Sequence, residues 1–153
     1  MYGPADGRMF KKARSAFIKS LAGYSLFCFI LQVKDRHNGN ILIDREGHLV
    51  HIDFGFLLSN SPGKGINFEQ APFKLTEDFV RIMGGIHSKS FKKFRKLCVS
   101  GFIALRKRSE KIMLIIDMTR IGSGGNFSCF TGSEVMEDLR GRFHPFPAMN
   151  KRD

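Results

Sequence analysis

The residues best suited to chemistry lie in two short strings, DRHNGN and DFG, which are separated by twelve residues of a different character. Asp35 and His37 are an acid/base pair, because an imidazole that titrates near neutral pH can accept the proton of a hydroxyl group. Asn40 and Asp53 bring an amide oxygen and a carboxylate, which are hard ligands that suit Mg²⁺. An acid/base pair beside a metal pair is typical of a phosphoryl-transfer site.

The residues between the two strings, ILIDREGHLVHI, predict a β-hairpin that would position these groups. Two short apolar runs flank a polar turn at residues 45–47, which ends in a glycine. Folded about Glu46, the ribbon pairs Asn40 with Ile52 and sets Asn40 beside Asp53. We therefore expect the amide oxygen and the carboxylate to converge at the open end of the hairpin.

The order of these motifs matches the kinase sequence of a catalytic loop followed by a metal-binding loop, except that the protein-kinase string H-R-D is inverted to D-R-H. The inverted string resembles the phosphatidylinositol 3-/4-kinase superfamily. Residues 32–63 are similar to the type III phosphatidylinositol 4-kinases, and residues 71–85 (APFKLTEDFVRIMGG) are most similar to the beta-type enzymes. Weaker similarity covers residues 1–31, 91–112 and 126–143.

The resemblance implies roles for the residues of both strings. His37 would accept the proton of an inositol hydroxyl, and Asp35 would orient either His37 or that hydroxyl. Arg36 would fix the loop or a neighbouring acid. Asn40 and Asp53 would hold Mg²⁺.

The resemblance also implies contacts with ATP and with a lipid. Leu42 and Ile52 would form an apolar wall beneath the adenine. The loop that follows D-F-G would recognise the lipid head group, and it carries Lys64 and Lys74 but no basic run. This composition is consistent with phosphatidylinositol itself, whose head group has no extra phosphates to pair with cations.

The composition favours anionic partners, because 25 basic residues outnumber 14 acidic ones and give a formal net charge of +11. Acidic lipid surfaces, nucleotide phosphates and nucleic acid would all suit such a charge. With the resemblance, we expect an anionic membrane surface containing phosphatidylinositol and no nucleic acid. The expected location is cytoplasmic and peripheral, on the cytosolic face of membranes, with the Golgi as one candidate.

The patterning predicts an α+β, mostly helical fold with a short β-hairpin. The resemblance implies that this fold is the large C-terminal lobe of a protein-kinase-like domain with the hairpin at its active site. The apolar spacing after residue 8 predicts one long helix or two stacked helices. Thr76 is expected to cap a helix, and Gly101 is the candidate break in a later one. The expected helices cover residues 9–32, 76–85, 90–118 and 133–143, with a glycine-rich linker at residues 121–125.

The chain is expected to be a partial catalytic domain, residues 1–153, without the small N-terminal lobe that holds the phosphates of ATP. The expected function is phosphorylation of phosphatidylinositol at the 4-position as part of a full domain, with the chain inactive by itself. One alternative is an inactive lobe that binds lipid or a partner. Another is a protein kinase of the lipid-kinase-like group, against which Lys34 and residues 72–76 argue.

Overall fold

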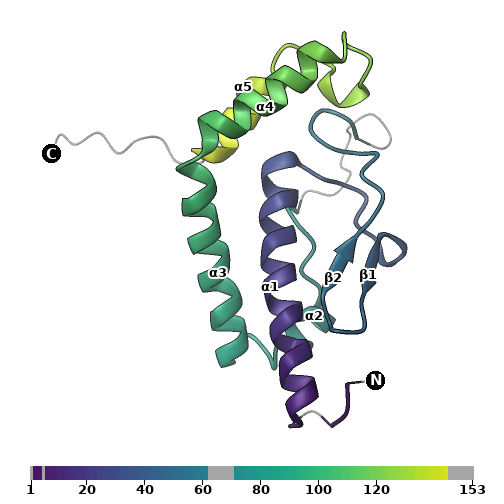
Figure 1. Ribbon diagram of the computed structural model, residues 1–153, viewed down its shortest axis with the longest axis vertical. Helices are drawn as coiled ribbons and strands as arrows, with labels where there is room; N and C mark the ends of the chain where they lie inside the picture. The colour runs from purple at the N-terminus through teal and green to yellow at the C-terminus, as the bar shows by residue number, and fades with distance from the viewer. Residues whose placement is uncertain (1, 5, 62–70, 145–153) are drawn as a thin grey trace, which may run out of the picture.

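The computed structural model describes residues 2–4, 6–61 and 71–144, and a small two-stranded sheet lies at one edge of its helices, beside the first helix (Figure 1). This architecture confirms the α+β, mostly helical class and the single hairpin within these residues. The elements in chain order are α1 (Arg8–Leu31), η1 (Asn38–Asn40), β1 (Ile41–Ile43), β2 (Leu49–His51), α2 (Glu77–Ile82), α3 (Lys89–Arg106), α4 (Ser109–Gly122), η3 (Ser128–Phe130) and α5 (Val135–Phe143).

Helix α1 is the central element, and it lies between α3 and the hairpin (Figure 1). It is one continuous helix rather than two, with Phe17, Leu21 and Cys28 among its buried residues. Within the described residues, α1 is the one helix whose length and composition would suit a membrane span. Because α3, β2 and α5 pack against it, α1 is better explained as the core helix of a folded domain.

The hairpin has the predicted register: Ile41 pairs with His51, Leu42 with Val50 and Ile43 with Leu49. The N–H of Ile52 donates to the carbonyl of Asn40 at 3.0 Å and extends the ladder by one step toward the D-F-G string.

The hairpin is held against α1 at both its strand and its turn. Leu49 donates its N–H to Oγ of Ser20, a residue of α1, at 2.9 Å. At the turn, Gly47 has φ +93°, and a Cβ there would lie 2.7 Å from the carbonyl oxygen of Ala13. Glycine is therefore required both by the left-handed backbone and by the close approach to α1.

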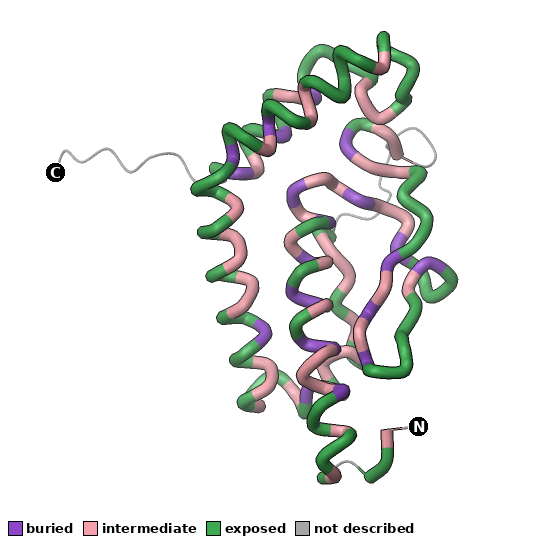
Figure 2. The backbone as a smooth tube through the Cα atoms, in the orientation of Figure 1, coloured by how far each residue is buried: buried purple, intermediate pink, exposed green. Residues whose placement is uncertain are grey.

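Two apolar clusters form the core, and buried residues recur along the inner side of α1 in Figure 2. The first joins α1 to the hairpin, α2 and α3 through residues such as Leu21, Leu49 and Phe94. The second joins the end of α1 to α4 and α5 through Ile30, Met113 and Leu139, among others. The two clusters share α1, so this helix ties the hairpin to the C-terminal helices.

Three helix predictions can be compared with these bounds. Thr76 caps α2 as predicted, since its hydroxyl accepts from the N–H of Phe79 at 3.3 Å. The predicted break at Gly101 is wrong: α3 continues to Arg106, and α4 begins at Ser109. A Cβ at Gly101 would lie 2.5 Å from Cδ1 of Leu26, so this glycine permits close packing of α1 on α3. The linker also begins later than predicted, because α4 includes Gly122.

Candidate active site

The D-R-H loop and the D-F-G loop are joined by main-chain hydrogen bonds. The N–H of Lys34 donates to the carbonyl of Phe56 at 3.0 Å, and the N–H of Leu58 donates to the carbonyl of Leu31 at 2.8 Å. The two loops therefore run side by side after α1 and after β2. This arrangement brings together residues that are more than twenty positions apart in the sequence.

Arg36 is buried between these loops, with 2% of its surface exposed. Its Nε donates to the carbonyl of Lys34 at 2.9 Å, and its Nη1 donates to the carbonyl of Ile52 at 2.8 Å. Its Nη2 donates to the carbonyl of Asp53. A buried cation is tolerated only when such acceptors replace water. Of the two roles expected for Arg36, its contacts therefore match fixing the loop.

Phe54, the middle residue of D-F-G, packs against the D-R-H loop and against α1, and the sequence interpretation gave it no role. The guanidinium of Arg36 lies 5.6 Å from the centre of its ring, and the ring of Phe27 from α1 meets it edge-to-face at 5.6 Å. These contacts suit the negative face of an aromatic ring. The D-F-G string after D-R-H was the available signal, but it does not reveal which side chains Phe54 would contact.

His37 lies on the catalytic loop with both ring nitrogens in polar contact. Its Nδ1 accepts the N–H of Gly39 at 3.1 Å, and its Nε2 lies 3.1 Å from Nδ2 of Asn40 and 3.8 Å from Oδ2 of Asp35. A neutral imidazole carries one proton, and the Gly39 N–H requires a lone pair on Nδ1. The Gly39 bond thus favours the tautomer with the proton on Nε2, on the side of the Asp35 carboxylate. In that tautomer the 3.1 Å contact between Nε2 and Nδ2 of Asn40 joins two donors and is not a hydrogen bond.

Both aspartates of the candidate site have left-handed backbones, with φ 61° at Asp35 and φ 59° at Asp53. Few non-glycine residues adopt this conformation, and aspartate is among those that tolerate it. At Asp53, the carboxylate Oδ1 accepts the N–H of Gly55 at 3.2 Å. Such strain often accompanies functional sites, where the surrounding contacts hold the residue in place.

The donor set near the open end of the hairpin fits Mg²⁺. The amide nitrogen of Asn40 donates to the carbonyl of Asp35 at 2.9 Å, so its amide oxygen is the atom suited to a cation. Asp53 is exposed and contributes carboxylate oxygens. Within the described residues, no three His, Cys, Asp or Glu side chains cluster closely enough to hold a metal ion with protein ligands alone. A two-ligand site is typical of Mg²⁺ that also binds substrate phosphates.

The hairpin has one buried and one open face. Leu49 and His51 pack toward α1, while Leu42 is 48% exposed and Ile52 is 39% exposed on the other side. Residues paired across a ladder share a face, and alternate residues point the same way. Leu42 and Ile52 thus lie together on the open face, as an apolar wall beneath a nucleotide would require.

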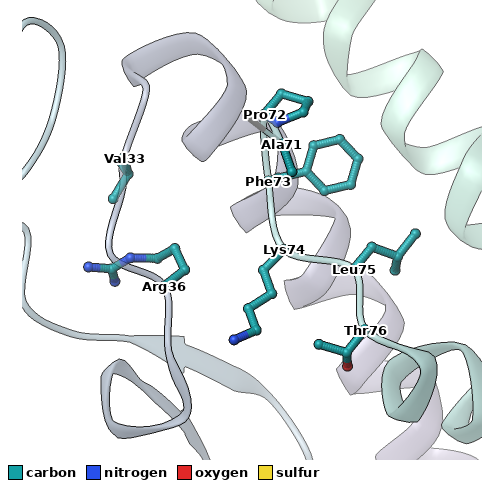
Figure 3. A pocket seen from close by; sticks show the side chains of 8 residues that line it. All are labelled: Val33, Arg36, Ala71, Pro72, Phe73, Lys74, Leu75 and Thr76. Atoms are coloured by element: carbon teal, nitrogen blue, oxygen red, sulfur yellow. The ribbon is translucent and has the colours of Figure 1, made fainter. Parts of the chain in front are cut away.

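Lys74 lies in a pocket of about 460 Å³ between residues 71–76 and the catalytic loop. Figure 3 shows its side chain extending toward the loop, while the guanidinium of Arg36 points the other way. Lys64, the other expected head-group residue, lies outside the described residues.

His51, on the inner face of the hairpin, is a buried histidine to which the sequence interpretation gave no role. Its ring stacks on Tyr24 at 4.1 Å, and its Nδ1 lies 3.8 Å from Sγ of Cys28. Burial, with a smaller contribution from the nearby charge of Arg36, lowers its pKa from 6.5 to about 4. His51 is therefore neutral at physiological pH and packs the inner face of the hairpin against Tyr24 of α1.

Comparison with known proteins places these motifs in a family. The family described as phosphatidylinositol 3- and 4-kinase matches residues 4–120. The chain is 55% identical over 153 residues to phosphatidylinositol 4-kinase of Dictyostelium discoideum, covering 99% of this chain and 12% of that protein. It is 51% identical over 140 residues to phosphatidylinositol 4-kinase beta 1 of Arabidopsis thaliana, covering 88% and 12%.

A vertebrate relative gives the same result. The chain is 47% identical over 143 residues to phosphatidylinositol 4-kinase beta of Danio rerio, covering 94% of this chain and 17% of that protein. The chain thus spans less than a fifth of the length of these three relatives. The matches confirm the resemblance to the beta-type enzymes, and the chain belongs to the phosphatidylinositol 3- and 4-kinase family.

Proposed function

We propose that this chain forms the large lobe of a kinase that transfers the γ-phosphoryl group of ATP to the 4-hydroxyl of phosphatidylinositol. The observation that carries the proposal is the Arg36 clamp, which holds the D-R-H loop against the D-F-G loop. Catalysis of phosphoryl transfer depends mainly on positioning and electrostatics, and this clamp joins the loop that carries His37 to the loop that carries Asp53.

In the proposed reaction, the inositol oxygen attacks the γ-phosphorus, ADP leaves and the hydroxyl proton passes to His37. Nδ1 of His37 is bonded to the N–H of Gly39, so the substrate hydroxyl must replace that donor. Once protonated, the ring would carry N–H groups on both nitrogens. The Asp35 carboxylate, 3.8 Å from Nε2, then stabilises the positive charge and keeps the ring oriented.

The residues at the open end of the hairpin are assigned to Mg²⁺ and ATP. The amide oxygen of Asn40 and the carboxylate of Asp53 would hold the ion. When bound, Mg²⁺ neutralises charge on the transferring phosphoryl group. Leu42 and Ile52, which are both exposed, would contact the adenine from below.

Lys74 and Lys64 are assigned to the lipid head group. The pocket at Lys74 opens beside the catalytic loop, so its ammonium can meet an anionic group while the inositol ring reaches His37. The excess of basic residues would hold the protein on the cytosolic face of anionic membranes, with the Golgi as one candidate. Nucleic acid is not among the partners that we propose.

A second lobe is needed for this function. Within the described residues, the hairpin supplies a floor for the nucleotide but no strand covers it. We propose that residues 1–153 are a partial catalytic domain and that a small lobe with a strand lysine completes it. A polypeptide of these 153 residues by itself would then bind lipid or a partner without turnover.

The test of this function is the identity of the product. The complete two-lobed protein is incubated with Mg-ATP and phosphatidylinositol vesicles, and the position of the new phosphate is mapped after deacylation. We expect the 4-phosphate from the complete protein and no product from the 153-residue polypeptide. Phosphate at the 3-position, or transfer only to protein substrates, would contradict the proposal.

A further inference from the structure

A second pocket, of about 290 Å³, lies where the end of α1 meets residues 71–72 and α5. Val33, Ala71 and Pro72 line both this pocket and the Lys74 pocket, so the two are neighbours (Figure 3). Two basic residues, Lys34 and Arg142, are among those that line the new pocket. They are more than a hundred positions apart, so no local pattern predicted that they would line one pocket.

Arg142 is held in place at the end of α1. Its Nε donates to the carbonyl of Ile30 at 2.8 Å, which satisfies one of the carbonyls that a helix leaves unpaired at its C-terminus. Burial lowers the pKa of Arg142, and the charge of Asp138 opposes that shift. A guanidinium has five N–H donors, so one bond to Ile30 leaves donors for a ligand.

The main chain of Lys34 is fixed from two sides. Its N–H donates to Phe56, and its carbonyl accepts from Nε of Arg36. The chain turns sharply just before it, because Gln32 has a left-handed backbone with φ 49°. Within the described residues, the ammonium of Lys34 has no carboxylate within salt-bridge distance.

The pocket also excludes part of the solvent that weakens charge interactions. Phe29 and Pro72 supply apolar walls, and the half-buried Gln32 offers an amide. Contacts between ions strengthen as water is removed. Two cations in a pocket of this size suit a small anion with several oxygens better than a carboxylate of the chain itself, because phosphate accepts a forked guanidinium and an ammonium together.

We propose that Lys34, which immediately precedes D-R-H, and Arg142 form a binding site for a phosphate group that is distinct from the catalytic and metal-binding residues His37, Asn40 and Asp53. The group is either the phosphodiester of a phosphatidylinositol head group or free phosphate. The first source rests on the proposed function, whereas the second does not. An arginine that serves only to join α5 to α1 would explain the bond to Ile30 but not the presence of a second basic residue, Lys34, in the lining of the same pocket.

The test is a binding titration with the full protein that carries this chain, using glycerophosphoinositol and inorganic phosphate as separate probes followed by ³¹P NMR. Lys34→Met removes the ammonium and keeps the chain length. Lys96→Met, an exposed position on α3, is the matched control. We expect Lys34→Met to weaken binding about tenfold, as loss of a charge-assisted hydrogen bond does, and Lys96→Met to leave it unchanged.

The two probes distinguish the sources. Weakening confined to glycerophosphoinositol supports the lipid head group, and equal weakening of both supports free phosphate. Arg142→Gln should also weaken binding, with thermal unfolding as a check on its link to α1; if it unfolds, Lys34→Met decides. Unchanged binding in Lys34→Met, or equal weakening in Lys96→Met, would overturn the site. These titrations do not depend on turnover, so an inactive protein with the site intact would refute only the proposed function.

Discussion

Arg36 donates a hydrogen bond from Nη1 to the main-chain carbonyl of Ile52, 2.8 Å away. A residue of the catalytic loop thereby fastens the last position before D-F-G. The next carbonyl, that of Asp53, also accepts from Arg36, and the ring of Phe54 lies beneath the guanidinium. The position of Asp53 relative to His37 consequently depends on one buried side chain.

Replacing Arg36 should loosen this junction. Arg36→Met removes the three donors and leaves the carbonyls of Lys34, Ile52 and Asp53 without them. We expect the free energy of unfolding, measured by urea denaturation, to fall by about 3 kcal/mol. Arg45→Met, at an exposed position of the hairpin turn, is the control and should change it by less than about 0.5 kcal/mol. Equal losses of unfolding free energy in the two variants would show that the hydrogen bonds of Arg36 do not stabilise the junction of the loops.

The turn of the hairpin should be sensitive to a single methyl group. Gly47→Ala places a Cβ against the backbone of Ala13 and requires a left-handed alanine, so we expect a loss of at least about 2 kcal/mol in unfolding free energy. Gly141→Ala is the matched control, since nothing lies within 4 Å of its added Cβ in α5. That change should stabilise the protein by up to about 1 kcal/mol. Tolerance of Gly47→Ala would mean that the hairpin does not pack on α1 as described.

His51 should make stability depend on pH. Its pKa is about 4 in the folded protein and 6.5 in the reference state, so unfolding takes up a proton between these values. The contribution of neutral His51 to the free energy of unfolding is complete above pH 6.5 and is lost as the pH falls toward 4. At about 1.4 kcal/mol per pKa unit, it amounts to at most about 3 kcal/mol.

The measurement is unfolding free energy from pH 4 to 8 for the wild type and for His51→Phe, which keeps an aromatic ring against Tyr24. The difference in unfolding free energy between the wild type and His51→Phe should become smaller or change sign as the pH falls. Parallel curves would show that His51 does not titrate in this range.

Much of the fold could be predicted from local patterns. The hairpin register followed from two apolar runs and a polar turn, and the Thr76 cap followed from residue type. The break at Gly101 was mispredicted because a glycine in a helix can serve either a bend or a close contact. The partner that decides, Leu26, lies on another helix and is invisible to local pattern.

The candidate site likewise has a part that local motifs predicted and a part that depends on tertiary packing. The order and spacing of the two strings predicted His37, Asn40 and Asp53 as candidate site residues, because these motifs are local in the sequence. The donor at Nδ1 of His37, the ring over Arg36 and the meeting of Lys34 with Arg142 arise from tertiary packing. No periodicity in the sequence encodes those contacts.

His37 should matter for turnover more than for binding. In the complete kinase, His37→Ala should lower kcat by roughly 10²–10⁴, the usual contribution of a general base. Asp35→Asn keeps the size of its side chain and removes the charge near Nε2, so it should lower kcat by a smaller factor while leaving KM for phosphatidylinositol nearly unchanged. Unchanged kcat in His37→Ala would exclude it as the proton acceptor.

The central claim is that the two joined loops form a phosphoryl-transfer centre for phosphatidylinositol, and Asp53 tests it most directly. The measurement is the rate of phosphatidylinositol 4-phosphate formation by the complete kinase at saturating Mg-ATP. Asp53→Ala is compared with Asp117→Ala, which removes a carboxylate paired with Arg120 on α4, away from the site. We predict that Asp53→Ala lowers the rate by at least about 10²-fold and that Asp117→Ala leaves it within about twofold. A folded Asp53→Ala enzyme that retains the wild-type rate would contradict the account.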